Sequence, residues 1–161
     1  MNIKQNWPSI KEHFKNTFRS SLHVSIASVD QQNQPTVTPI GSLFLNDNMT
    51  GFYFEKYPSK LPAHAQGNKN ICVLGVNSNK RFWLKSLFRN RFSQYPAIKL
   101  YGTLGEKREA TPTELRALKR RMRFTKRFKG HQYLWGEMNR IRDVHFHKAE
   151  VINLGEMTSH L

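Results

Sequence analysis

The sequence contains a single cysteine, Cys72, among its 161 residues. An internal disulfide and a cysteine-based metal cluster are therefore both excluded. Cys72 lies in the apolar run 71–74, where a free thiol is expected to be buried. No apolar run approaches the roughly 20 residues of a membrane-spanning helix, and the first residues lack the apolar core of a signal peptide. We therefore expect a cytoplasmic protein with no membrane span.

Internal repeats and long low-complexity stretches are also absent from the sequence. Apolar residues make up 38% of the chain and aromatic residues 12%. A chain of this length buries roughly 70% of the surface that its unfolded form exposes. We therefore expect one domain, residues 1–161, with a hydrophobic core of its own.

Acidic residues are scarce: 11 Asp and Glu stand against 26 Lys and Arg, for a net charge of +15. Such a charge favours polyanionic partners. The basic residues concentrate in an aromatic-rich insert, 79–96, and around a helix expected at 111–128. A basic and aromatic surface suits nucleic acid, but no nucleic-acid-binding signature is present and a charged helix face is usually solvated. Nucleic acid is therefore not the expected partner, and selection of an anionic small-molecule substrate is the second interpretation.

Hydrophobic periodicity predicts a helix at 3–19, with Pro8 in its first turn, and a short helix from Ser59 to about residue 66. A further helix begins at Thr111, where Pro112 and Glu114 complete a capping box. The insert 79–96 is interpreted as either a short amphipathic helix or a long loop. Strands are expected at residues 23–29, 36–45, 49–56, 71–76, 98–106 and 144–154.

The order of these elements favours an antiparallel sheet over a parallel one, because regular helical crossovers between the strands are missing. The first three strands are expected to form a meander. Closure into a barrel would remove the exposed sheet edges. The predicted fold is mainly β (α+β): a six-stranded antiparallel split β-barrel with peripheral helices.

Several segments in this order resemble the split barrels of pyridoxamine-5′-phosphate-oxidase-like proteins, which bind flavin mononucleotide (FMN). They are HVSIASVD, TVTPIGSLFL, GFYFEK, the Ser-Lys pair at 59–60, NICVL and AIKLYGTLGE, with a weaker match at VHFHKAEVINL. The resemblance spans about residues 20–110. It implies a homodimer with two FMN sites at the subunit interface.

Lys60 is the residue that best matches the phosphate-binding lysine of these proteins. Independently of the resemblance, Ser59 and Lys60 at a helix N-terminus offer a hydroxyl, an ammonium group and free backbone N–H groups to a phosphate. The alternative interpretation is a solvated lysine beside an ordinary helix cap.

The resemblance also places the second strand against the flavin ring and phosphate. Gly41 would let the backbone approach a flat ligand, and Ser42 would donate to phosphate. The sequence departs from the vitamin oxidases here, because no arginine occurs between residues 20 and 80. Alternatively, Pro39 and Gly41 mark a bulge in an edge strand. The candidate residues in this strand are Thr38, Pro39, Ile40, Gly41 and Ser42.

The remaining candidate residues come from two other strands. The resemblance implies that the main chain of Phe54, Glu55 and Lys56 lies beside the ribityl chain. It also implies that Lys99 and Tyr101 reach the flavin of the other subunit, although such positions are often only the solvent face of a strand.

Histidines offer two competing sites. His145 and His147 share a strand face, but no third ligand accompanies them, so no metal site is expected. His160 resembles a C-terminal haem ligand of a branch of the same fold. No catalytic residue is identified, and FMN would carry the hydride. The predicted function is an FMN-dependent oxidoreductase of an unidentified small substrate; the alternative is a non-enzymatic module that binds a flavin, haem or a polyanion.

Overall fold

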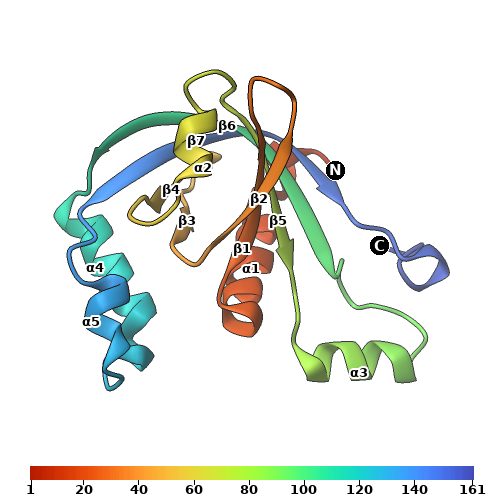
Figure 1. Cartoon of the computed structure of the whole chain (residues 1–161). Coiled ribbons are helices and arrows are strands. Elements are labelled where there is room, and N and C mark those ends of the chain that lie inside the picture. Colours follow the sequence, from red (N-terminus) through yellow and green to blue (C-terminus); the bar gives the residue numbers. More distant parts are fainter.

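The computed structural model describes residues 1–161. Seven strands form one antiparallel sheet in the order β2-β1-β5-β6-β7-β4-β3, which curls over helix α1 (Figure 1). The strands are β1 (Val24–Val29), β2 (Pro35–Ile40), β3 (Leu43–Leu45), β4 (Thr50–Phe54), β5 (Asn70–Val76), β6 (Ala97–Glu109) and β7 (Arg140–Val151). The helices are α1 (Ile3–Ser21), α2 (Lys60–His64), α3 (Lys80–Phe88), α4 (Pro112–Arg121) and α5 (Gly130–Trp135), with 3₁₀ turns η1 (Met122–Thr125) and η2 (Gly155–Met157).

The sheet has seven strands rather than the predicted six, because the strand expected at 36–45 is interrupted at Gly41 and Ser42. Its first half, β2, pairs with β1, and its second half, β3, pairs with β4. Both antiparallel pairings of the expected three-strand meander are therefore present, but its middle strand is broken into β2 and β3. Since β2 and β3 are the two edges of the sheet and only two residues separate them, the curled sheet closes on itself at this link. This arrangement is consistent with the predicted antiparallel split barrel.

Helix α1 fills the inside of the curled sheet. Trp7, Ile10 and Phe14 are buried among the inward-facing side chains of β1, β5, β6 and β7. Each such side chain contributes roughly 1.5–3 kcal/mol by leaving water. Phe14 packs directly on Gly75, where a Cβ atom would lie 3.0 Å from the ring. The main core therefore holds α1 and the sheet together.

Two expectations about helix ends had different outcomes. The capping box of α4 is confirmed: the Thr111 hydroxyl accepts from the Glu114 backbone, and the Glu114 side chain accepts from the Thr111 backbone. The prediction for Pro8 was wrong, because α1 already begins at Ile3, with the Asn2 side chain accepting hydrogen bonds from the first turn. Asn2 satisfies the free N–H groups one turn earlier than the proline signal indicated.

The peripheral helices lie on opposite sides of α1, with α4 and α5 near one end of the sheet and α3 near the other (Figure 1). Helix α3 shows that the first half of the insert 79–96 is helical. Helix α4 ends at Arg121, earlier than predicted, and a second hydrophobic cluster anchors it to β4 and β7. None of the helices combines the length and apolar character needed to cross a lipid bilayer.

Candidate functional site

The two residues expected to bind phosphate are exposed. Ser59 is the N-cap residue of α2, but its side chain makes no capping hydrogen bond. Lys60 begins the helix and forms no ion pair or hydrogen bond. Ser59 therefore occupies the expected N-cap position, but the expected capping hydrogen bond from its side chain is absent. The Ser59 hydroxyl and the Lys60 ammonium group are both free to bind a ligand. Helix α2 packs beside β1 and β2, where a buried hydrogen bond joins Ser28 Oγ and His64 Nδ1 at 2.9 Å.

The candidate residues of β2 divide between the core and the surface. Ile40 is buried in the main core, whereas Pro39 is exposed and Thr38 half-buried. The Ile40 side chain therefore cannot contact a flavin. Thr38 and Pro39 pair with Ile26 and Ser25 of β1 in an unbroken register, so β2 contains no bulge.

Gly41 and Ser42 are both used by the fold. A Cβ atom at Gly41 would lie 3.2 Å from the Leu22 carbonyl oxygen and 3.4 Å from the Trp135 ring. The close approach at this glycine is therefore made by the chain itself. The Ser42 hydroxyl accepts from the Phe54 backbone N–H at 3.2 Å and lies 3.3 Å from the Phe54 carbonyl, to which it donates. Ser42 thus joins β3 to β4 rather than offering a free donor to phosphate.

Glu55 lies in a buried polar network at the end of β4. Its side chain is 2% exposed and accepts from Arg142 Nε at 2.6 Å and Arg142 Nη2 at 3.1 Å. Lys107 Nζ lies 3.0 Å from Oε1, which also accepts from Arg142 Nη2, and the Tyr53 hydroxyl donates to Oε2 at 2.9 Å. Burial alone would raise the pKa of Glu55, but the hydrogen bonds from Arg142, Lys107 and Tyr53 together lower it. The carboxylate is therefore charged, fully satisfied and structural.

The neighbours of Glu55 also have structural contacts. Phe54 is buried in the second hydrophobic cluster. The Lys56 ammonium group donates to the carbonyl oxygens of Gly136 at 2.8 Å and Tyr133 at 3.3 Å. Lys56 therefore fixes α5 and its following turn against the end of β4.

Lys99 and Tyr101 lie half-buried on the outer face of the sheet, on either side of the buried Leu100. The Tyr101 hydroxyl donates to Glu150 at 2.8 Å, and this bond raises the pKa of Tyr101 to about 12. Burial raises the pKa of the neighbouring Cys72 thiol, which is only half-buried rather than fully buried as expected. In the sheet order, β1 and β5 separate β6 from β2. Roughly 14 Å of sheet therefore lies between Lys99 and the β2 residues, at about 4.8 Å per strand.

The chain thus separates the candidate residues into three groups. The first group lies on β2, on its link to β3 and at the end of β4, where Ser42 bonds to Phe54. The second is Ser59 and Lys60 at the start of α2, which packs against β1 and β2, and the third lies on β6. The arginines that reach the first group were not predicted from the sequence. Arg121 Nη1 donates to the carbonyl oxygens of Gly41 and Leu43, while Arg142 binds Glu55, 87 residues away in sequence. No local signal could have shown either contact, because both depend on how β7 and α4 pack against the strands.

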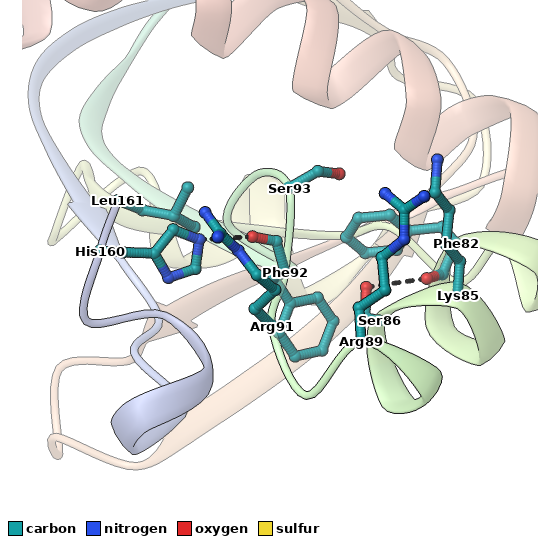
Figure 2. A pocket seen from close by; sticks show the side chains of 9 residues that line it. All are labelled: Phe82, Lys85, Ser86, Arg89, Arg91, Phe92, Ser93, His160 and Leu161. Atoms are coloured by element: carbon teal, nitrogen blue, oxygen red, sulfur yellow. Dashed lines mark hydrogen bonds between the residues drawn. The ribbon is translucent and has the colours of Figure 1, made fainter.

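A cavity of about 610 Å³ lies between α3 and the C-terminus (Figure 2). Three cations line it, together with Phe82, Phe92 and His160. His160 Nε2 lies 2.8 Å from the Phe92 carbonyl oxygen, so this nitrogen is engaged by the backbone. None of the twelve candidate flavin residues lines this cavity. The cations are Lys85, Arg89 and Arg91.

His145 and His147 are exposed on β7 on either side of the buried Phe146. No group of three His, Cys, Asp or Glu side chains lies close enough together to hold a metal ion. The structure therefore brings no third ligand to this histidine pair.

Solved structures with a similar fold include an FMN-binding protein from Syntrophomonas wolfei, with a TM-score of 0.61 and 13% identity over 94% of this chain and 95% of that chain. A candidate pyridoxamine 5′-phosphate oxidase from Lactobacillus delbrueckii has a TM-score of 0.52 and 16% identity over 87% and 91%. The haem-storage protein HutZ from Vibrio cholerae has a TM-score of 0.51 and 12% identity over 89% and 92%.

These likenesses cover nearly the whole of each chain at low sequence identity, so they establish a shared fold. No family model matches the sequence, and no curated protein matches it. The resemblance to pyridoxamine-5′-phosphate-oxidase-like split barrels that the sequence predicted is therefore confirmed at the level of the fold.

Proposed function

We propose that this chain is a cytoplasmic FMN-binding flavoprotein and an oxidoreductase of a small, anionic substrate. The observation that carries the proposal is the exposed pair Ser59 and Lys60, whose side chains have no partner in the chain and which begin a helix packed against β1 and β2, in a fold shared with an FMN-binding protein. A phosphate group needs a cation and hydrogen-bond donors, and this pair supplies both. When bound, FMN would supply the hydride chemistry.

The residues present fit the phosphate end of FMN but do not form a complete site in one chain. Ser42 is engaged by Phe54, and Lys99 and Tyr101 lie three strands away from β2. A second copy supplies the missing side of the site in this proposal. The proposed homodimer places Lys99 and Tyr101 of one copy near Lys60 of the other, as a two-fold interface allows.

Titration of FMN into purified protein tests the phosphate contact. Lys60→Ala is expected to weaken FMN binding at least about tenfold, because a charge-assisted contact contributes about 1.5–3 kcal/mol. Lys4→Ala is the matched control, since it removes the same charge from an exposed side chain on α1. Equal FMN affinity of the Lys60→Ala and Lys4→Ala variants would refute the assignment.

Mixing two variants that each bind FMN weakly tests whether the site is shared between subunits. Lys60→Ala and Lys99→Ala homodimers should each bind FMN weakly. A heterodimer of the two contains one site with both lysines, so denaturing and refolding the mixture should restore tight binding at a fraction of the sites. Absence of any restored binding, with mixed dimers demonstrated by native mass spectrometry, contradicts a site built across the interface.

A haem-binding module is the second candidate function. It is favoured by His160, which lines a cavity with two aromatic rings and three cations suited to haem carboxylates; Nε2 is held by the Phe92 carbonyl, so Nδ1 would be the ligand atom. Adding haemin to the unaltered chain should then give a Soret band at roughly 400 nm. This band should be lost in the His160→Ala variant. A Soret band of unchanged position and intensity in His160→Ala would exclude this histidine as the ligand.

A further inference from the structure

A second cavity, of about 710 Å³, lies between α1, β3 and the end of α4. Its volume is in the range of small-molecule pockets. The lining is mostly apolar and includes Phe18, Phe44 and Trp135. None of the candidate FMN or haem residues lines it, so the two proposed functions leave it unused.

The charged residues that line this cavity are all basic. Lys11 is paired with Asp47, and Lys15 with Glu12. The three arginines form no ion pair with any acidic side chain. The lining therefore carries a positive charge that the chain itself does not neutralise. The basic lining residues are Lys11, Lys15, Arg19, Arg120 and Arg121.

Arg121 is held rigidly at the wall of the cavity. Its guanidinium carbon lies 3.6 Å from the centre of the Phe44 ring and 4.2 Å from that of Phe18. One nitrogen, Nη1, donates to the backbone carbonyls of Gly41 and Leu43. Nε and Nη2 donate to no protein group, and no fully buried side-chain nitrogen lacks a partner. These two nitrogens are therefore at least partly exposed.

The environment of Arg121 is unfavourable for an isolated charge. Burial lowers the pKa of Arg121 to about 10, and no carboxylate opposes this effect. A cation that is fixed, partly desolvated and unpaired attracts an anion strongly, because water competes for it less than at the surface. A neutral apolar ligand would desolvate the guanidinium further without compensating its charge.

We propose that this cavity binds a small anionic amphiphile, whose apolar body packs against Phe18, Phe44 and Trp135 and whose carboxylate or phosphate group pairs with Arg121. Arg19 and Arg120 add to the positive potential that guides the head group. The apolar body is either an acyl chain or a fused aromatic ring system, since the lining offers both aliphatic and aromatic side chains.

Calorimetric titration of the full chain with dodecanoate and with 2-naphthoate tests the proposal and separates the two kinds of body. At least one of these anions should bind saturably, and dodecyltrimethylammonium should not displace it. Arg121→Gln should weaken the binding at least tenfold. Arg116→Gln is the matched control, because Arg116 is an exposed arginine on the same helix that does not line the cavity.

A second variant keeps the test decisive if Arg121→Gln does not fold. Ala117 lines the cavity, so Ala117→Phe should fill part of it and abolish binding while leaving the basic residues in place. The proposal is overturned if neither anion binds saturably to the unaltered chain. It is also overturned if Arg121→Gln and Ala117→Phe, shown to be folded by circular dichroism, both bind as the unaltered chain does.

Discussion

Arg142 on β7 and Arg121 at the end of α4 both contact the first half of the chain, but they are held in opposite ways. Arg142 donates two hydrogen bonds to the buried Glu55, and this contact raises the pKa of Arg142. Arg121 meets only backbone carbonyls and aromatic rings, and its pKa is lowered. The charge of one arginine is neutralised inside the fold, whereas the charge of the other is left for a ligand. Similar placement of the same side chain therefore need not mean the same role.

Removing one side of the neutralised pair should have the largest effect on stability. Arg142→Gln and Glu55→Gln are each expected to lower the free energy of unfolding by about 1.5–3 kcal/mol, because each removes charge-assisted hydrogen bonds from a buried group, although Lys107 and Tyr53 remain beside Glu55 in the first variant. Urea unfolding measures this. The double variant should be more stable than the sum of the two losses predicts, by about 2 kcal/mol. Simple additivity of the two losses would contradict a coupled pair.

Arg121→Gln should have a much smaller effect on stability in the absence of ligand. No carboxylate loses its partner, and the loss of bonds to Gly41 and Leu43 is offset by relief of the desolvated charge. We expect a change in the free energy of unfolding of about 1 kcal/mol or less, measured in urea. A loss as large as that of Arg142→Gln would erase the distinction between the two arginines and assign Arg121 to the fold.

Acid should act on the Glu55 network selectively. The folded-state pKa of Glu55 lies below its ordinary value of 4.5. The carboxylate therefore contributes stability that is complete above pH 4.5 and is lost as the pH falls through the folded-state pKa. Below pH 4.5, the free energy of unfolding should fall less steeply with decreasing pH in the Glu55→Gln/Arg142→Gln variant than in the unaltered chain. The difference in slope should correspond to the uptake of less than about one proton on unfolding. Identical slopes would show that Glu55 has the same pKa folded and unfolded.

The regular parts of the fold could be predicted from the sequence. Alternating apolar residues marked β1, β4 and β5, and the spacing of Trp7, Ile10 and Phe14 marked α1. The capping box at Thr111 marked the start of α4. These signals are local, because each depends on residues a few positions apart.

The break at Gly41 and Ser42 could not be predicted, since the apolar pattern continues across it. The break becomes visible only when Ser42 bonds to Phe54 and the two halves of the strand pair with different partners. The candidate site shows the same limit. The sequence predicted Ser59 and Lys60 as polar residues at the start of a helix, and both are exposed there. The burial of Glu55, in contrast, depends on Arg142, a residue 87 positions away.

The absorbance spectrum of the purified protein, before and after addition of FMN, tests the central claim most directly. The proposed function predicts a yellow protein with a flavin band at about 450 nm, or a colourless protein that retains added FMN through gel filtration. A protein that is colourless as purified and that releases all added FMN would contradict the claim that this split barrel is a flavoprotein.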